Sequence, residues 1–217
     1  MRLHGTEPPA GPWRVQPVAE VAAWLRTRLG HPLARPAVLA VDGRSAGGKS
    51  TFADLLRQCV PRSWVVHTDD VAWYHSFFDW APLLAAGVLE PVRRGEPVSF
   101  RPPGWQQRSR PGAVEVPAGL DLLVVEGVGS SRRELTDLVD GSVWVQSDAD
   151  LARRRGVARD GGTAAAEDFW AEWEGHELPF LEADRPWQRA LLVVNGTPPA
   201  SHDAAREVAV ADGPLHG

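Results

Sequence analysis

The sequence is poor in cysteine and in long apolar runs. One cysteine, Cys59, excludes an internal disulfide, and the seven histidines do not stand at metal-ligand spacing with cysteine or carboxylate partners. No segment reaches the roughly 20 apolar residues that cross a bilayer, and the first residues, MRLHGTEPPAGPWR, lack the apolar centre of a signal peptide. These absences predict a cytoplasmic protein without structural zinc.

Positive charge is also scarce. Lysine and arginine number 23 against 28 aspartates and glutamates, which gives a formal net charge of -5 at pH 7. Nucleic-acid backbones and anionic membranes bind basic surfaces, so the composition favours neither as a partner. The sequence leaves the oligomeric state open, a homodimer included.

Five apolar runs rich in valine and leucine predict buried strands of a parallel sheet. They cover residues 37–42, 63–68, 121–127, 141–147 and 189–196. Helical candidates cover residues 17–29, 49–60, 81–89, 132–139, 148–160 and 164–184. Because strands alternate with helices, we expect one α/β domain over residues 1–217, a doubly wound, five-stranded parallel sheet flanked by helices. The first dozen residues and a tail of about 198–217 are expected to be loose ends.

The only lysine, Lys49, stands in GRSAGGKS, which fits the eight-residue P-loop pattern. The loop joins a predicted strand to a predicted helix, so successive backbone N–H groups face one concave spot where phosphate can bind. Lys49 then serves the β and γ phosphates of ATP, and Ser50 offers a hydroxyl to Mg²⁺. The alternative is a glycine-rich turn with a surface lysine. The predicted nucleotide-binding residues are Gly43, Ser45, Ala46, Gly47, Gly48, Lys49, Ser50 and Thr51.

Carboxylates follow two of the predicted strands. Asp69 and Asp70 stand at the carboxyl edge of the sheet, where ligands of doubly wound folds bind. A carboxylate there can accept the proton of a hydroxyl that attacks the γ-phosphate, so Asp69 is the candidate base and Asp70 the reserve. The alternative is that the two aspartates cap the next helix. Glu126, at the end of LLVVEG, is a candidate Mg²⁺ ligand together with Ser50.

The segment DADLARRRGVARDGG is rich in arginine and ends in glycines that permit hinge motion. Arg155 and Arg159 are four residues apart on one predicted helix face, so both can stabilise charge on a transferring phosphate. We therefore predict a lid at about residues 148–163. For Arg153 and Arg154, a solvated helix face paired with aspartates is an equal alternative.

Together, VDGRSAGGKST, HTDD, VVEGVG and RGVARDG resemble the uridine kinase-like branch of the P-loop kinases, a group with pantothenate kinase and phosphoribulokinase relatives. The resemblance covers roughly residues 36–196. It implies ATP- and Mg²⁺-dependent transfer of phosphate to a hydroxyl of a small-molecule acceptor, a nucleoside or similar metabolite. It also implies that Asp69 is the base and that Arg155 and Arg159 are lid arginines, with Arg153 a looser match.

Residues of about 71–118 resemble the acceptor-binding insertion of that family, with one departure. Family uridine kinases carry an aromatic pair directly after the base, and a Tyr-Asp and a histidine later in the insertion, whereas this chain has VAWY and then RPPGWQQRS. The identity of the acceptor therefore stays open. Aromatic faces can stack on a planar ring and arginine can bind a carboxylate or phosphate; the alternative is that the tryptophans pack the insertion onto the sheet. The candidate acceptor contacts are Asp70, Tyr74, Trp80, Arg101 and Trp105.

The sequence leaves two other functions open. Arg101, Arg108 and Arg110 in the insertion favour a kinase of a nucleotide or an antibiotic-like compound. The other alternative is a nucleotide-binding regulatory ATPase without a metabolite acceptor. A guanine-reading Asn-Lys-x-Asp motif is excluded, because the only lysine lies in the P-loop.

The last predicted helix, residues 164–184, carries four large or charged residues at helical spacing: Trp170, Trp173, Glu177 and Phe180. We interpret them as core contacts with one polar face. The sequence gives no reason to place this helix against substrate.

Overall fold

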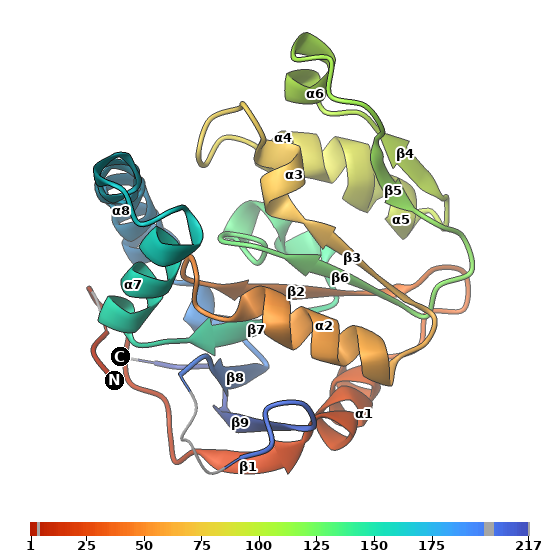
Figure 1. The fold of residues 1–217 in the computed structure, drawn as a ribbon. Helices are drawn as coiled ribbons and strands as arrows, with labels where there is room; N and C mark the ends of the chain where they lie inside the picture. The colour runs from red at the N-terminus through yellow and green to blue at the C-terminus, as the bar shows by residue number, and fades with distance from the viewer. Residues whose placement is uncertain (4, 198–201, 217) are drawn as a thin grey trace.

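The computed structural model describes residues 1–3, 5–197 and 202–216. Its central sheet is built from β1 (Arg14–Pro17), β2 (Ala37–Gly43), β3 (Ser63–His67), β6 (Leu122–Glu126), β7 (Gly141–Gln146), β8 (Leu192–Asn195) and β9 (Glu207–Asp212). The strand order is β1-β9-β8-β7-β2-β6-β3 (Figure 1). A separate antiparallel pair, β4 (Val98–Phe100) and β5 (Val114–Val116), lies in the insertion.

The helices cover both faces of this sheet (Figure 1). The α-helices are α1 (Val18–Leu29), α2 (Lys49–Cys59), α3 (Thr68–Ala72), α4 (Ala81–Leu84), α5 (Glu90–Arg93), α6 (Pro103–Gln107), α7 (Ala149–Arg159) and α8 (Ala164–Asp184). A π-helix, η1 (Ala85–Leu89), continues α4, and two 3₁₀ helices are η2 (Arg133–Leu138) and η3 (Pro186–Gln188). None of the helices in the described part of the chain has both the length and the apolar character needed to cross a membrane.

The five predicted parallel strands correspond to β2, β3, β6, β7 and β8. The pairs β2·β6, β2·β7, β3·β6 and β7·β8 are all parallel, which confirms the doubly wound α/β fold. The sheet nevertheless has seven strands rather than five, because β9 pairs antiparallel with both β8 and β1.

The prediction that both chain ends are loose was therefore wrong for parts of the first dozen residues and of the predicted tail. In the predicted tail, β9 buries Val208, Ala209, Val210 and Ala211 and covers an edge of β8 that would otherwise be unpaired. Near the N-terminus, Glu7 is buried and the amide of Ala10 donates to Gln146. Residues 198–201 of the predicted tail lie outside the described residues.

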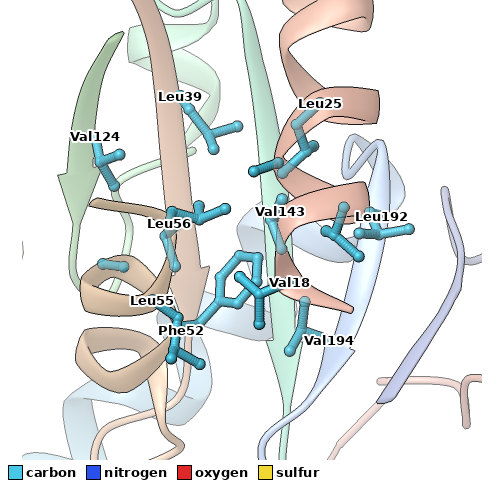
Figure 2. Packing of buried hydrophobic residues seen from close by; sticks show 14 of the residues in the cluster. Val18, Leu25, Leu39, Phe52, Leu55, Leu56, Val124, Val143, Leu192 and Val194 are labelled. Carbon is cyan, nitrogen blue, oxygen red and sulfur yellow. The ribbon is translucent and has the colours of Figure 1, made fainter. Parts of the chain in front are cut away.

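One core cluster lies between α1, α2 and a face of the sheet (Figure 2). Leu39 and Val41 of β2 belong to this cluster. Val38 belongs to the cluster on the opposite face, because successive side chains of a strand point to opposite faces of the sheet. Burial on both faces explains why the strand sequences are continuously apolar. Burying a side chain such as Phe52 or Leu56 contributes about 1.5–3 kcal/mol relative to exposure.

The opposite face is covered by two different layers. The insertion packs Trp80, Leu84 and Val88 against one half of the sheet. Over the other half, α8 and η3 pack around Trp144 and Trp187, whose rings meet edge to face with centroids 5.5 Å apart. The insertion and α8 therefore share this face.

Asp140 fastens the insertion to the amino ends of the parallel strands. Its carboxylate lies 2.7 Å from Arg35 and 2.8 Å from Arg93, and it accepts the amide of Val38 at 2.8 Å. Burial acts to raise the pKa of Asp140, but the hydrogen bonds from Arg35 and Val38 outweigh it and hold that pKa below its usual value. Asp140 is thus an ionised anchor on the edge opposite the P-loop.

Candidate active site

The carboxyl ends of β2, β6 and β3 meet at one edge of the sheet around a cavity of about 80 Å³. Parallel pairing brings Val41 opposite Glu126, and Glu126 opposite His67, so that side chains distant in sequence become neighbours. The residues that line the cavity are Ser45, Ala46, Gly47, Gly48, Lys49, Ser50, Asp69, Glu126, Gly127, Val128 and Arg159. The structure thus brings together six predicted P-loop residues, the candidate base, the candidate metal ligand and one lid arginine.

Glycine lets the P-loop leave β2 in a tight turn. Gly43 has φ +152°, and a Cβ at this position would lie 2.5 Å from the carbonyl oxygen of Val145. A side chain at position 43 would therefore clash with β7 at the start of the loop. Helix α2 begins at Lys49, so its N-terminal amides open on the cavity.

Lys49 is buried, and its Nζ donates to the carbonyl oxygen of Arg44 at 2.9 Å. This bond fixes the ammonium inside the loop. Its charge acts to lower the pKa of both Asp69 and Glu126 across the cavity. The sole lysine therefore contributes positive charge to the cavity at the P-loop.

The two adjacent aspartates have different surroundings. Asp69 is exposed at the cavity wall but enclosed by protein on its other sides, and this enclosure raises its pKa, while Lys49 and Arg159 oppose the rise. The carboxylate of Asp70 instead pairs with Arg110 at 2.8 Å, and its backbone oxygen accepts Nε1 of Trp105 at 2.8 Å. Asp70 therefore joins α3 to the insertion, and this geometry favours Asp69 as the base.

Glu126 has a partner that the sequence analysis missed. Nδ1 of His67 lies 2.6 Å from its carboxylate. Burial acts to raise the pKa of Glu126, but the hydrogen bond with His67 and the charge of Lys49 outweigh it and lower that pKa. The only sequence signal for His67 is its place at the end of a strand that, in this fold, neighbours the strand of Glu126.

Glu126 and Ser50 fit a magnesium site. Ser50 and Glu126 both line the cavity, and Ser50 is one of the groups that lower the pKa of Glu126, so two hard oxygen donors lie at the same cavity. Directly after Glu126, Gly127 lets the chain pass close to α3, since a Cβ there would lie 1.7 Å from Oγ1 of Thr68. Within the described residues, no group of three or more His, Cys, Asp and Glu side chains is arranged to hold a metal. This donor set suits Mg²⁺ that is also bound by phosphate oxygens.

A second cavity of about 440 Å³ adjoins the P-loop and was not foreseen from the sequence. Thr51 lines it together with apolar residues such as Leu55 and Val208. Residues of β9 form one wall of this cavity. The sequence analysis missed this wall because it expected the C-terminal segment to be loose. Its position beside the P-loop and its size suit the nucleoside part of a nucleotide.

The arginines of the predicted lid are placed differently from one another. Arg159 lines both cavities and pairs with Asp160 at 2.9 Å. Arg155 lines the second cavity and donates to the carbonyl oxygen of Gly196 at 3.0 Å, so the structure does not bring it to the phosphate cavity. Arg153 forms ion pairs with Glu167 and Glu174 of α8, so its partners are glutamates of another helix rather than the aspartates expected.

The candidate acceptor residues divide into buried and exposed ones. Trp80 and Trp105 are buried, and Trp80 packs in the core of the insertion, which is the packing alternative rather than an acceptor contact. Tyr74 is 60% exposed, and the Arg108 guanidinium lies 4.0 Å from its ring centroid. Arg101 is exposed and donates to the backbone of the insertion. Neither cavity at the P-loop is lined by these predicted contacts.

No protein-family model matches the chain. Uridine kinase-like protein 5 of Arabidopsis thaliana is 26% identical over an alignment of 147 residues, which covers 59% of this chain and 31% of that protein. Uridine-cytidine kinase A of Dictyostelium discoideum is 26% identical over an alignment of 145 residues, which covers 59% of this chain and 29% of that protein. The matched region thus spans less than a third of the length of these curated relatives.

Two solved structures share the fold. D-glycerate 3-kinase from Cryptococcus neoformans superposes with a TM-score of 0.55 at 13% identity, over 88% of this chain and 98% of that one. A "possible uridine kinase" from Bacillus stearothermophilus superposes with a TM-score of 0.51 at 20% identity, over 81% of this chain and 96% of that one. Motifs, curated relatives and fold together support the resemblance of this chain to the uridine kinase-like branch of the P-loop kinases.

Proposed function

We propose that this protein is a kinase that transfers the γ-phosphate of ATP to a hydroxyl of a small molecule. The observation that carries the proposal is the phosphate-sized cavity in which Lys49, Asp69 and Glu126 converge at the P-loop. The similarity to uridine kinase-like proteins supports the same reaction class.

The chain's own residues divide the work as follows. Lys49 and the amides of the P-loop bind the β and γ phosphates, and the second cavity receives the nucleoside, with Arg155 at its wall. Asp69 accepts the proton as the acceptor oxygen forms its bond to the γ-phosphorus and the bond to the leaving ADP oxygen breaks.

Two further groups act on phosphate charge. Arg159 stabilises the charge on the transferring phosphoryl group from the lid side of the cavity. Ser50 and Glu126 would hold Mg²⁺, which would neutralise part of the phosphate charge when bound. Positioning and electrostatics therefore account for catalysis without a covalent intermediate.

A screen for acceptor-dependent ATP consumption tests the proposal. Purified protein with ATP and Mg²⁺ is assayed against nucleosides, sugars, vitamins and hydroxy acids such as glycerate, a class suggested by one structural neighbour. We expect one acceptor class to stimulate ADP formation. Slow ATP loss that no acceptor accelerates, with a partner protein that responds to ATP, supports the regulatory ATPase instead.

Arg108 favours a narrower second candidate, a kinase of an anionic acceptor such as a nucleotide. Its guanidinium stacks on the exposed ring of Tyr74, and it forms no ion pair within 4.0 Å in the described parts of the chain. A phosphate-bearing acceptor should then be preferred over its neutral parent compound. Preference for the neutral compound would exclude this candidate and leave the general kinase proposal intact.

A further inference from the structure

Helix α8 contacts the P-loop through a buried carboxylate. Glu177 accepts the backbone N–H of Ser45 at 2.7 Å, and its other carboxylate oxygen lies 3.6 Å from Nη2 of Arg44. The side chains of Arg44 and Glu177 are 5% and 3% exposed. A side chain that the sequence assigned to a core helix therefore holds two consecutive residues of the P-loop.

A second buried carboxylate lies near Arg44. Glu7, from the N-terminal segment, accepts Nε1 of Trp144 at 2.7 Å and Nε2 of Gln146 at 2.8 Å. The Arg44 charge acts to lower the pKa of Glu7, while the larger effect, burial, raises it. The Arg44 side chain is thus enclosed by protein, and it is not among the residues that line the cavity at the P-loop.

A buried ion pair of this kind adds little to stability compared with apolar residues of the same size. Its geometric effect is clearer, because it fixes the first turn of the P-loop relative to a helix of 21 residues. The same helix positions the lid side of the site: Nε1 of Trp170 donates to Asp160 at 2.8 Å, and Asp160 pairs with Arg159.

The amide of Ser45 is hydrogen-bonded to Glu177 of α8. The amide of Gly47 donates to the carbonyl oxygen of Arg44 at 3.0 Å. Phosphate binding therefore falls to the amides at the N-terminus of α2, which can bind phosphate only if the loop keeps its open shape. A preorganised loop binds phosphate without reorganising its dipoles first. An unbraced Ser45 amide would leave the loop free to adopt other shapes.

We propose that Glu177 is a positioning residue for nucleotide binding, which braces the P-loop from α8 by holding the Ser45 amide and Arg44. This inference rests on the proposed function, since it assumes that the P-loop binds a nucleoside triphosphate. Glu177 does not touch the nucleotide.

The test compares Glu177→Gln with Glu177→Leu. Both variants remove the charge opposite Arg44, but only glutamine keeps an oxygen that can accept the Ser45 amide. We expect Mg-ATP affinity, measured by calorimetric titration, to fall about tenfold in Glu177→Leu and to be largely restored in Glu177→Gln. Glu172→Gln, an exposed carboxylate on the same helix, is the matched control and should bind like the wild type.

A merely structural role would lower the thermal stability of Glu177→Leu without separating the two variants in ATP affinity. Equal affinity in both variants would therefore overturn the inference. If the unpaired Arg44 prevents folding, the same pair of variants is compared in an Arg44→Met background, where the charge of Arg44 is removed as well. Failure of the wild type itself to bind ATP would refute the proposed function. If the wild type binds ATP normally and the variants bind it equally well, only the role of Glu177 is refuted and the proposed function stands.

Discussion

The P-loop edge and the insertion both carry many charged residues, but they use them differently. At the P-loop edge, Lys49 and Asp69 form no ion pair within 4.0 Å in the described parts of the chain, and both line the cavity. In the insertion, Asp70 is paired with Arg110, whose guanidinium also lies 3.6 Å from the Trp105 ring centroid. A charge that forms no ion pair at the wall of a cavity is available to a ligand, whereas the Asp70–Arg110 pair holds the insertion in place.

Two tryptophans of the insertion also hold structure. Trp80 and Trp105 of the insertion are buried and use their indole nitrogens on backbone oxygens of Phe77 and Asp70. They stabilise the insertion against the sheet instead of presenting faces to an acceptor. Residue type alone therefore did not separate a binding role from a packing role.

Replacing each of the two neighbouring aspartates in turn is expected to give the largest difference in activity between the P-loop edge and the insertion. Asp69→Asn should lower kcat about 10³-fold with ATP affinity retained, because it removes the base but not the cradle. Asp70→Asn should lower kcat less than about tenfold, since its amide oxygen can still accept from Arg110. Steady-state kinetics with the identified acceptor measure both, and the reverse ranking would make Asp70 the base.

Substituting the sole lysine tests the cradle itself. Lys49→Arg keeps the charge but places a broad, directional guanidinium in a slot closed by the Arg44 carbonyl. We expect kcat/KM for ATP to fall about 10²-fold. A value close to that of the wild type would show that charge alone suffices there.

Acidification should affect the same edge. Enclosure raises the pKa of Asp69 above its usual value, so the ionised base is lost as the pH falls through that raised pKa. Below it, kcat/KM should fall about tenfold per pH unit. The profile of Asp70→Asn serves as the control and should match the wild type, and a wild-type rate independent of pH over this range would argue against Asp69 as the base.

The smallest effect on activity is expected where charges only hold structure. Asp140→Asn should lower the free energy of unfolding by about 2 kcal/mol through its lost pairs with Arg35 and Arg93, and leave kcat within about twofold. The pKa of Asp140 is lowered in the folded state, so its stabilisation is present at neutral pH and lost as the pH falls through that pKa. Denaturant titrations at several pH values should show the gap between wild type and variant narrowing with acid, and a constant gap would contradict this account.

The features that the sequence predicted correctly are local ones. The P-loop and the five parallel strands are encoded by contiguous runs, such as GRSAGGKS and AVLAVD, whose pattern is readable without the partners. The shared edge of Asp69 and Glu126 followed from the rules of parallel sheets.

The features that sequence reasoning missed depend on distant partners. EVAVAD is short and became β9 only because β8 and β1 offered edges to pair with. Likewise, the contact of His67 with Glu126 spans 59 residues and that of Ser45 with Glu177 spans 132. Such pairings are set by packing, which no single stretch of sequence encodes.

The fate of the γ-phosphate tests the central claim most directly. Incubation with ATP, Mg²⁺ and the stimulating acceptor, followed by phosphorus NMR, distinguishes a phosphorylated acceptor from free phosphate. We predict one phosphorylated acceptor for each ADP formed, and loss of this product in Asp69→Asn. Release of inorganic phosphate in equal amount to ADP, with the acceptor unchanged, would contradict a kinase built on the P-loop edge.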